Sequence, residues 1–247
     1  MNRFQNKTAF ITGGNSGIGK ESALIIAKEG ANIMIADIKE NKDVLKELES
    51  LGVKAAFIAC DVSDPMAVKE AVTATVKTFG SLDVAFNNAG VGDEGFIHEK
   101  TFEQWKKVID INLSGVFYCM KYEIEQMLQQ KNGGNIINVS SILGQVGTPG
   151  ASAYVAAKHG VVGLTQTAAA EYGAKNIRVN AIGPGYIETP LLHSMSREQK
   201  YALEQMHPMK RLGRPEEVAK AFLWLASDDS SFMTGDYIPV DGGYLAQ

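Results

Sequence analysis

Short, continuously apolar runs alternate with segments of helical periodicity along almost the whole chain. The apolar runs occupy residues 8–11, 32–36, 55–59, 84–87, 135–139, 178–182 and 237–240, and helical segments occupy 20–29, 42–51, 65–79, 102–130, 152–172 and 215–226. Strands that alternate with helices predict βαβ units and a parallel sheet, and continuously apolar strands indicate a sheet covered on both faces. With right-handed crossovers, the sequence therefore predicts an α/β fold: a three-layer, doubly wound parallel sheet of the Rossmann type.

We expect one domain, residues 1–247, because no linker or charge block divides the chain. Its least regular stretch, at about 188–212, mixes methionines with polar residues. Irregular segments of this kind often close over a binding site, so this stretch is predicted to form a lid.

The composition argues against several classes of protein. The net charge is −4, whereas a nucleic-acid-binding protein would need a basic face. No apolar run reaches the length of about 18 residues that a membrane span requires. The two cysteines, Cys60 and Cys119, and the four histidines fit no metal-ligand spacing. We therefore expect buried reduced thiols, no metal, no membrane or nucleic-acid partner, and a cytoplasmic location.

A glycine-rich loop separates the first apolar run from the first helical segment. Gly13, Gly17 and Gly19 form a Gly-x-x-x-Gly-x-Gly pattern, with Asn15, Ser16 and Ile18 between them. Such glycines permit a tight turn and a close approach to a pyrophosphate at a helix N-terminus. The rival nucleotide-binding P-loop needs a hydroxyl for Mg²⁺ where this chain has Glu21, so a dinucleotide is the favoured ligand.

Asp37 stands 18 residues after Gly19, at the end of the second apolar run. A carboxylate there accepts hydrogen bonds from an adenosine ribose and repels a 2′-phosphate, which favours NAD over NADP. The nearby Lys39 weakens that preference. Asp61 and Val62, after the third run, are predicted to flank the adenine, although Asp61 could equally be an ordinary loop aspartate.

Several motifs occur together in a fixed order. They are Thr12-Gly13-xxx-Gly17-Ile18-Gly19, Asn87-Asn88-Ala89-Gly90, Ser141, Tyr154-xxx-Lys158 and Pro184-Gly185. In this combination the chain resembles the short-chain dehydrogenase/reductase family over essentially its whole length, including 3-oxoacyl-(acyl-carrier-protein) reductases and glucose-dehydrogenase-like members. The resemblance implies an NAD-dependent oxidoreductase that interconverts a secondary alcohol and a ketone by hydride transfer.

The resemblance also implies a catalytic group. Tyr154 and Lys158 are four residues apart, hence on one helix face. A phenol has an ordinary pKa of about 10, and a neighbouring ammonium is expected to lower it, which makes Tyr154 the general acid/base. Ser141 is expected to bind the substrate oxygen, with Ser140 as its competitor. Asn112 would hold a water in a proton relay, a role that is inherited; from the residues alone it is a packing residue.

Further site residues follow from the resemblance. Cofactor contacts are implied for Asn88, Ala89, Gly90, Lys158, Pro184, Gly185, the backbone of Ile187 and the hydroxyl of Thr189. Substrate contacts are expected at Ser141, Leu143, Tyr154 and Tyr186, with pocket walls at 92–96, 142–150 and 191–209.

Two alternatives remain open at this point. One is a 3-oxoacyl-(acyl-carrier-protein) reductase that uses NADPH, and the other is a non-catalytic NAD-binding sensor on the same fold. The resemblance also implies a homotetramer that assembles through helices 102–130 and 152–172 and through the C-terminal segment.

Overall fold

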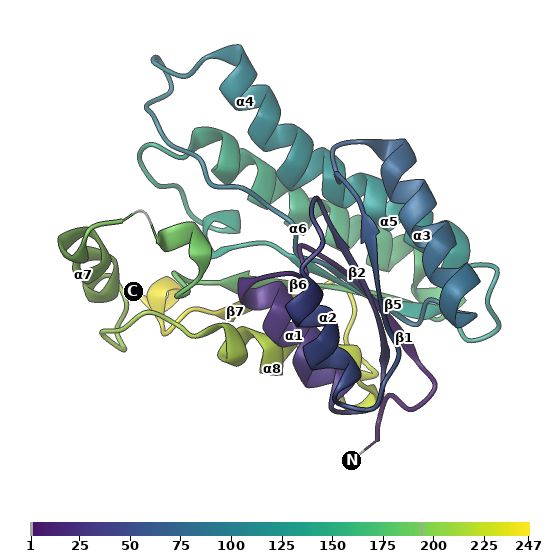
Figure 1. Cartoon of the computed structure of the whole chain (residues 1–247). Coiled ribbons are helices and arrows are strands. Elements are labelled where there is room, and N and C mark those ends of the chain that lie inside the picture. Colours follow the sequence, from purple (N-terminus) through teal and green to yellow (C-terminus); the bar gives the residue numbers. More distant parts are fainter. Residues whose placement is uncertain (1, 194) are drawn as a thin grey trace.

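The computed structural model describes residues 2–193 and 195–247 and contains a seven-stranded sheet (Figure 1). The strands are β1 (Thr8–Thr12), β2 (Asn32–Asp37), β3 (Ala55–Ala59), β4 (Val84–Asn87), β5 (Gly134–Val139), β6 (Ile177–Pro184) and β7 (Tyr237–Val240). They run parallel in the order β3-β2-β1-β4-β5-β6-β7. The predicted α/β, doubly wound fold is confirmed.

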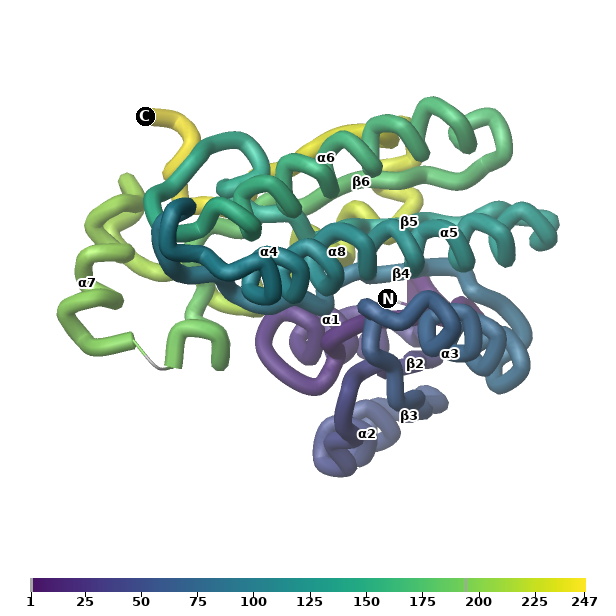
Figure 2. Tube along the Cα trace, turned by 90° about the horizontal axis from the view of Figure 1, so that it is seen from above, coloured from purple at the N-terminus to yellow at the C-terminus, as the bar shows by residue number. Residues whose placement is uncertain are grey.

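Helices cover both faces of the sheet, as Figure 2 shows from above. Helices α1 (Gly17–Ala27), α2 (Lys42–Glu49) and α8 (Pro215–Ala226) pack on one face. Helices α3 (Pro65–Phe79), α5 (Gly115–Met127) and α6 (Ser152–Tyr172) pack on the other. Short 3₁₀ turns occur at Ile142–Gly144, Gly173–Lys175, Pro190–Leu192, Asp228–Ser230 and Tyr244–Ala246.

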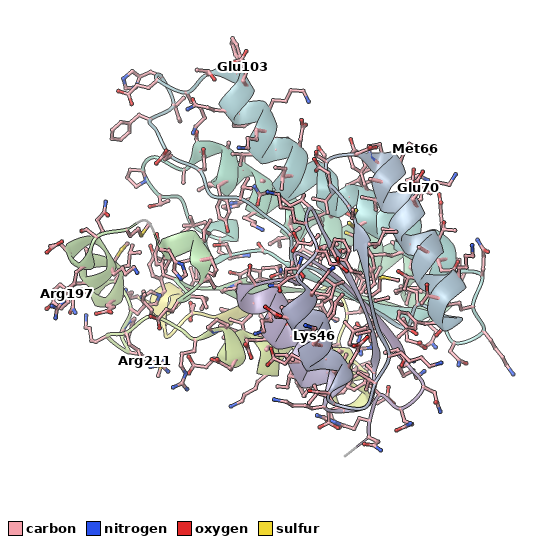
Figure 3. The ribbon with its side chains drawn as sticks, in the orientation of Figure 1. Lys46, Met66, Glu70, Glu103, Arg197 and Arg211 are labelled. Atoms are coloured by element: carbon pink, nitrogen blue, oxygen red, sulfur yellow. The ribbon has the colours of Figure 1, made fainter. Side chains whose placement is uncertain are left out.

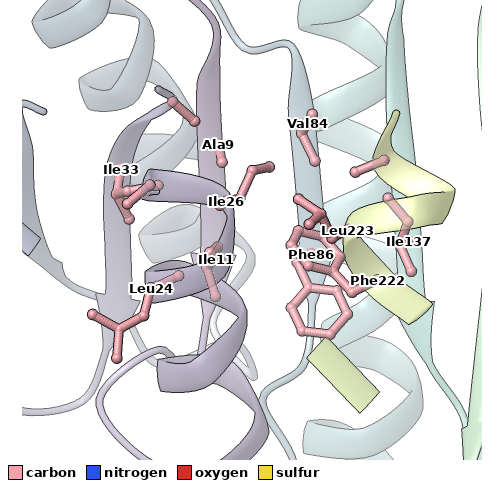
Figure 4. Close-up of a cluster of buried hydrophobic side chains, with 14 of the residues drawn as sticks. Ala9, Ile11, Leu24, Ile26, Ile33, Val84, Phe86, Ile137, Phe222 and Leu223 are labelled. Carbon is pink, nitrogen blue, oxygen red and sulfur yellow. The ribbon is translucent and has the colours of Figure 1, made fainter. Parts of the chain in front are cut away.

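Alternate residues of each central strand fill two separate cores. Ile11 and Phe86 face α1 and α8, whereas Phe10 and Ala85, their neighbours in sequence, face α3 and α5. The first core is drawn in Figure 4, where the Phe86 ring lies 4.3 Å from that of Phe222 on α8. This period of two explains why the strands are apolar throughout, since both faces of the sheet are buried.

Polar side chains lie on the outer surfaces of these helices. Lys46 of α2 and Glu70 of α3 are exposed and point away from the sheet in Figure 3. No helix within the described residues is long and apolar enough to cross a membrane.

The helix predicted for residues 102–130 is interrupted. The chain forms α4 (Phe102–Ile109), a π-helical turn (Asp110–Ser114) and α5, which ends at Met127. Asn112 lies in the π turn and is fully buried. One extra residue in a turn of helix leaves the apolar pattern almost unchanged, so periodicity could not show it.

Two other boundaries differ from the prediction. Helix α1 begins at Gly17 rather than residue 20, because the glycine loop itself forms the first turn. The segment expected to be irregular contains helix α7 (Arg197–Gln205), which a capping box between Ser196 and Gln199 begins. Ser194, inside the predicted lid, lies outside the described residues.

Candidate active site

The sheet brings the predicted site residues to one edge. The order β3-β2-β1-β4 reverses direction between β1 and β4, so the loops that follow these two strands diverge and leave a crevice at their carboxyl ends. Asp37 and Pro184 are the last residues of β2 and β6, and the segments after β1, β4 and β5 carry the glycine motif, Asn88 and Ser141 respectively. Residues from Gly13 to Pro184 therefore meet at one rim of the molecule.

The glycine loop is compressed in a way that only glycine allows. Gly13 has a φ of +64°, and a Cβ there would lie 2.9 Å from Asn88 Nδ2. A Cβ at Gly19 would collide with the carbonyl oxygen of Gly13. The loop therefore passes close to β4 and opens directly onto the N-terminus of α1, whose first N–H groups suit an anionic pyrophosphate.

Asn88 holds this loop in place. Its Nδ2 donates hydrogen bonds to the carbonyl oxygens of Thr12 (3.0 Å) and Gly13 (3.1 Å). Thr12 Oγ1 in return accepts the backbone N–H groups of Asn88 (3.0 Å) and Ala89 (3.1 Å). The sequence reasoning assigned no role to Thr12, although a hydroxyl directly before the first glycine was the available signal.

Asp37 lies at the end of β2, beside the same loop. Its carboxylate accepts the N–H of Asn15 at 3.2 Å and that of Ile38 at 2.8 Å. Asn15 Nδ2 also donates to the carbonyl oxygen of Lys39. The Asp37 side chain is partly exposed and oriented by the loop, as a ribose-binding carboxylate should be.

The predicted adenine contacts differ in exposure. Asp61 is exposed, and its Oδ1 accepts both the N–H (2.9 Å) and the hydroxyl (2.7 Å) of Ser63. Val62 is only 7% exposed and packs against Gly115 of α5. The adenine contacts at Asp61 and Val62 stay predictions.

Gly90 lies directly against Asn112 in the π turn. A Cβ at Gly90 would be 2.7 Å from Asn112 Oδ1. The Asn112 amide accepts the N–H of Val91 (3.2 Å) and donates to the Val91 (3.1 Å) and Val108 (3.0 Å) carbonyl oxygens. Its side chain thus ties the loop after β4 to the π turn; the proton-relay role stays a prediction.

Tyr154, Lys158 and Ser141 form one cluster. Lys158 Nζ lies 5.3 Å from the centre of the Tyr154 ring and donates to the carbonyl oxygen of Val139 at 2.7 Å. The Ser141 hydroxyl lies near enough to the Tyr154 phenol to oppose the rise in its pKa, and it accepts the N–H of Leu143 at 3.1 Å. Ser140 instead donates to the carbonyl oxygen of Lys158 at 3.0 Å, on the far side of the strand end. The geometry thus favours Ser141 over its neighbour.

Tyr237 of β7 holds the backbone of this cluster at Ser141. Its hydroxyl donates to the carbonyl oxygen of Ser141 at 2.7 Å, and a Cβ at Gly183 would overlap its ring. The sequence reasoning did not include Tyr237, since only the pairing of β7 with β6 brings it there.

Burial shifts both ionisable groups of the cluster toward their neutral forms. It raises the pKa of Tyr154 to about 12, although the Ser141 hydrogen bond acts in the opposite direction. It lowers the pKa of Lys158 to about 8. In the cofactor-free chain the pKa of Tyr154 therefore lies above its ordinary value, because burial removes the hydration that stabilises a phenolate. The expectation that Lys158 lowers this pKa stays a prediction.

The segment after β6 lies over the glycine loop. A Cβ at Gly17 would be 3.2 Å from the Thr189 methyl group, so Thr189 lies beside the glycine loop. The contact of its hydroxyl with a nicotinamide stays a prediction. Ile187 is 6% exposed and packs its side chain into the core, which leaves only its backbone for a ligand. Leu143 is equally buried at 6%, so it offers little surface to a substrate.

Tyr186 belongs to an aromatic group at the other side of the rim. Its ring centre lies 5.8 Å from that of His207 and 6.2 Å from that of Tyr244. The buried His207 accepts the N–H of Tyr186 at Nε2 (3.3 Å) and bonds the Leu203 carbonyl through Nδ1 (2.8 Å). His207 thus joins α7 to the end of β6, a role that its sequence position did not reveal.

A cavity of about 140 Å³ lies beside this aromatic group. Its lining includes Tyr186, Met209 and Asp241. Within residues 2–193 and 195–247, no group of three or more His, Cys, Asp or Glu side chains could hold a metal ion.

Comparison with known proteins places this arrangement in a family. The family model described as Enoyl-(Acyl carrier protein) reductase matches residues 13–245. Cyclohexanol dehydrogenase of Acinetobacter sp. (strain SE19) is 46% identical over 249 residues, which cover 100% of this chain and 98% of the relative. The 3-oxoacyl-[acyl-carrier-protein] reductase FabG of Thermotoga maritima is 43% identical and covers 98% of this chain and 99% of its own.

Solved structures agree along the whole chain. Carveol dehydrogenase of Mycobacterium avium in complex with NAD superposes with a TM-score of 0.96 at 31% identity, covering 100% of both chains. Other structures of this kind hold NAD or NADP.

A doubly wound sheet with relatives of this kind along its full length defines a nicotinamide-dependent oxidoreductase that interconverts secondary alcohols and ketones. Within that class, the chain belongs to the short-chain dehydrogenase/reductase family.

Proposed function

We propose that this enzyme is an NAD-linked dehydrogenase of cyclic secondary alcohols in which Tyr154 is the general acid/base. The observation that carries the proposal is the cluster at the end of β5, where the half-buried Tyr154 phenol lies near the Ser141 hydroxyl and Lys158 Nζ lies 5.3 Å from its ring centre. A phenol held beside a hydroxyl and a cation suits proton transfer to or from a carbonyl oxygen.

A bound nicotinamide would supply the hydride acceptor for alcohol oxidation and the hydride donor for ketone reduction. Ser141 Oγ would bind the substrate oxygen, and Tyr154 would take the alcohol proton during oxidation. Lys158 would stabilise the phenolate, together with the positive charge of the oxidised ring. Positive charge is needed there because burial, the largest influence, raises the pKa of Tyr154 to about 12.

The residues of the glycine loop fit the rest of the cofactor. Gly13 and Gly19 let the loop pack closely against Asn88, and the free N–H groups at the start of α1 suit a pyrophosphate. The Asp37 carboxylate suits two ribose hydroxyls and repels a 2′-phosphate, which supports NAD over NADP.

The substrate class follows from the walls of the site and from the relatives. Phe96 and Leu191 expose more than half of their apolar side chains near the rim, and Tyr186 adds an aromatic face. Such walls favour a compact apolar substrate over a charged one. The similarity to cyclohexanol dehydrogenase supports a six-membered ring.

A substrate panel with both cofactors tests this proposal. We expect cyclohexanol-type alcohols with NAD to give a kcat/KM at least tenfold higher than the same alcohols with NADP, and Asp37→Asn to narrow that ratio. Turnover confined to 3-oxoacyl thioesters with NADPH would establish the reductase instead. Cofactor binding without turnover of any alcohol or ketone would establish a sensor.

Several further features belong to the same proposal. The segment 188–212 acts as a lid, and Asn112 supports a proton relay from Lys158. The enzyme works as a homotetramer. Cys60 and Cys119 are both buried free thiols, which suits a reducing compartment such as the cytoplasm.

A further inference from the structure

Helix α6 carries Tyr154 in its first turn, yet it begins without a cap of its own. Its N-cap residue, Ala151, has no side chain that could accept a hydrogen bond. The first N–H groups of a helix have no partner within the helix and need one from elsewhere.

Asp93, from the loop after β4, supplies that partner. Its Oδ2 accepts the backbone N–H groups of Ala153 at 2.9 Å and of Tyr154 at 3.2 Å. A carboxylate is also a favourable charge at a helix N-terminus. The cap therefore comes from a residue 61 positions earlier in the chain and bonds directly to the backbone of Tyr154.

A buried lysine fixes this carboxylate. Lys100 Nζ lies 2.5 Å from Asp93 Oδ1, and the two side chains are only 4% and 2% exposed respectively. Lys100 Nζ also donates to the carbonyl oxygen of Glu94 at 2.8 Å. The two oxygens of Asp93 thus have different partners, since Oδ1 meets the lysine and Oδ2 meets the helix. A lysine and a carboxylate buried this deeply hold each other in one arrangement, because neither can regain water locally.

We propose that Asp93, neutralised by Lys100, is a positioning residue that sets the location of Tyr154 for proton transfer. The inference rests on the proposed role of Tyr154. Because the carboxylate bonds to the backbone of the acid/base residue itself, fraying of this helix turn would move the phenol away from Ser141. Misplacement of a reacting group by about 1 Å can cost about a hundredfold in rate.

The same carboxylate also joins the acid/base to the substrate. Asp93 lies within residues 92–96, which we expect to form one wall of the pocket. The hydrogen bonds of Asp93 therefore fix the position of this wall relative to Tyr154. Through them, the Asp93–Lys100 ion pair would couple the position of the substrate to that of the phenol.

Double variants test the inference, because a single substitution would leave one buried charge unpaired. D93A/K100M removes the cap and both charges, whereas D93N/K100M removes the charges but keeps an acceptor oxygen. A matched control, R3M/D229N, removes an exposed ion pair between the N-terminal segment and the turn after α8. We measure kcat, the KM for NAD, and hydrogen exchange of the peptide over residues 150–158 by mass spectrometry.

We expect D93A/K100M to lower kcat by about tenfold to a hundredfold with the KM for NAD within twofold, and to speed exchange in the 150–158 peptide. D93N/K100M should recover most of the kcat and of the protection, and the control should match the wild type. A wild-type kcat in D93A/K100M, unchanged exchange there, or no recovery in D93N/K100M would each overturn the proposal.

If D93A/K100M does not fold, D93S/K100M replaces it. The serine hydroxyl is a shorter acceptor, so D93S/K100M should have a lower kcat than the wild type but should lose less activity than complete loss of the cap would cause. Equal kcat values for D93S/K100M and D93N/K100M would overturn the inference. Tyr154→Phe is assayed in parallel. Retention of activity in Tyr154→Phe would refute the role of Tyr154 as the acid/base. The hydrogen-exchange data for the 150–158 peptide would still show independently whether Asp93 caps the helix.

Discussion

Tyr154 and Lys158 have pKa shifts in opposite directions that share one cause, the burial of a charge. The neutral phenol and the neutral amine are both favoured inside the cofactor-free site. Alcohol oxidation needs the phenolate, so its rate depends on how far positive charge offsets burial. At the scale of single residues, the proposed role of Tyr154 as a base therefore requires positive charge that the cofactor-free site does not supply by burial.

This predicts a pH profile with a definite sign. With saturating NAD, kcat/KM for alcohol oxidation should rise with pH and level off below pH 12, whereas ketone reduction should fall, because it needs protonated Tyr154. Tyr154→Phe should lower both rates by about 10²- to 10⁴-fold and leave NADH binding, measured by fluorescence, unchanged. A flat oxidation profile in the wild type would contradict this assignment.

Glu123 of α5 is a second buried ionisable group. Its Oε2 accepts Asn87 Nδ2 at 3.0 Å, while Glu123 Oε1 and Asn87 Oδ1 lack a partner among the described residues. Burial raises the pKa of Glu123 to about 8. Its helix neighbour Cys119 has a pKa that burial raises further, so this thiol stays neutral over the same range.

The folded chain therefore holds a proton on Glu123 that the unfolded chain releases above its ordinary pKa of 4.5. The free energy of unfolding should fall as pH rises from 4.5 to 8, by at most about 1.4 kcal/mol per unit. Glu123→Gln, a neutral isostere, should flatten this slope in urea denaturation at several pH values. Lys158, whose pKa burial lowers to about 8, changes stability in the opposite direction near pH 8, but it is present in both proteins and cancels in their comparison. Parallel curves for the two proteins would refute the assignment.

At the scale of elements, the start of α1 depends on glycine because backbone meets backbone there. Gly19→Ala would place a methyl group against the Gly13 carbonyl and against Asn88. We expect NAD affinity, measured by fluorescence titration, to fall at least tenfold, because the glycine loop would have to move apart to admit the methyl group.

Gly173→Ala is the matched control for this substitution. Gly173 follows α6 with helical dihedral angles, and no atom lies within 4 Å of its Cβ position. The Gly173→Ala substitution should leave NAD affinity unchanged and raise the free energy of unfolding by up to about 1 kcal/mol. Equal NAD affinity in Gly19→Ala and the wild type would show that the loop does not hold the pyrophosphate.

Element boundaries show where local pattern stops being informative. The seven strands and most helices follow from apolar periodicity, which depends on a few neighbouring residues. The π turn at Asp110–Ser114 could not be found this way, because Asn112 is held there by Val91, across a loop. Helix α7 could have been found, since Ser196 and Gln199 form a recognisable capping box.

At the scale of the whole molecule, helices α4 and α5 expose large apolar side chains. Trp105 of α4 and Phe117 and Leu128 of α5 remain 43%, 48% and 46% exposed. Their exposure is consistent with the proposed assembly through these helices, since apolar surface is commonly buried at interfaces. We expect light scattering to show a homotetramer and Phe117→Glu to shift it toward smaller species, with exposed Ile38→Glu as the control. A monomeric wild type would refute the assembly.

By itself the sequence determined the parallel α/β fold, the position of the glycine loop, and Ser141, Tyr154 and Lys158 as the candidate cluster. Each of these depends on spacing along the chain, and the periods of strands and helices convert that spacing into proximity. Only the tertiary structure decided that Asp93 caps α6, that Tyr237 bonds to the Ser141 carbonyl, and that burial raises the pKa of Tyr154. Those outcomes arise from contacts between distant segments and from the exclusion of water, and neither is encoded in local spacing.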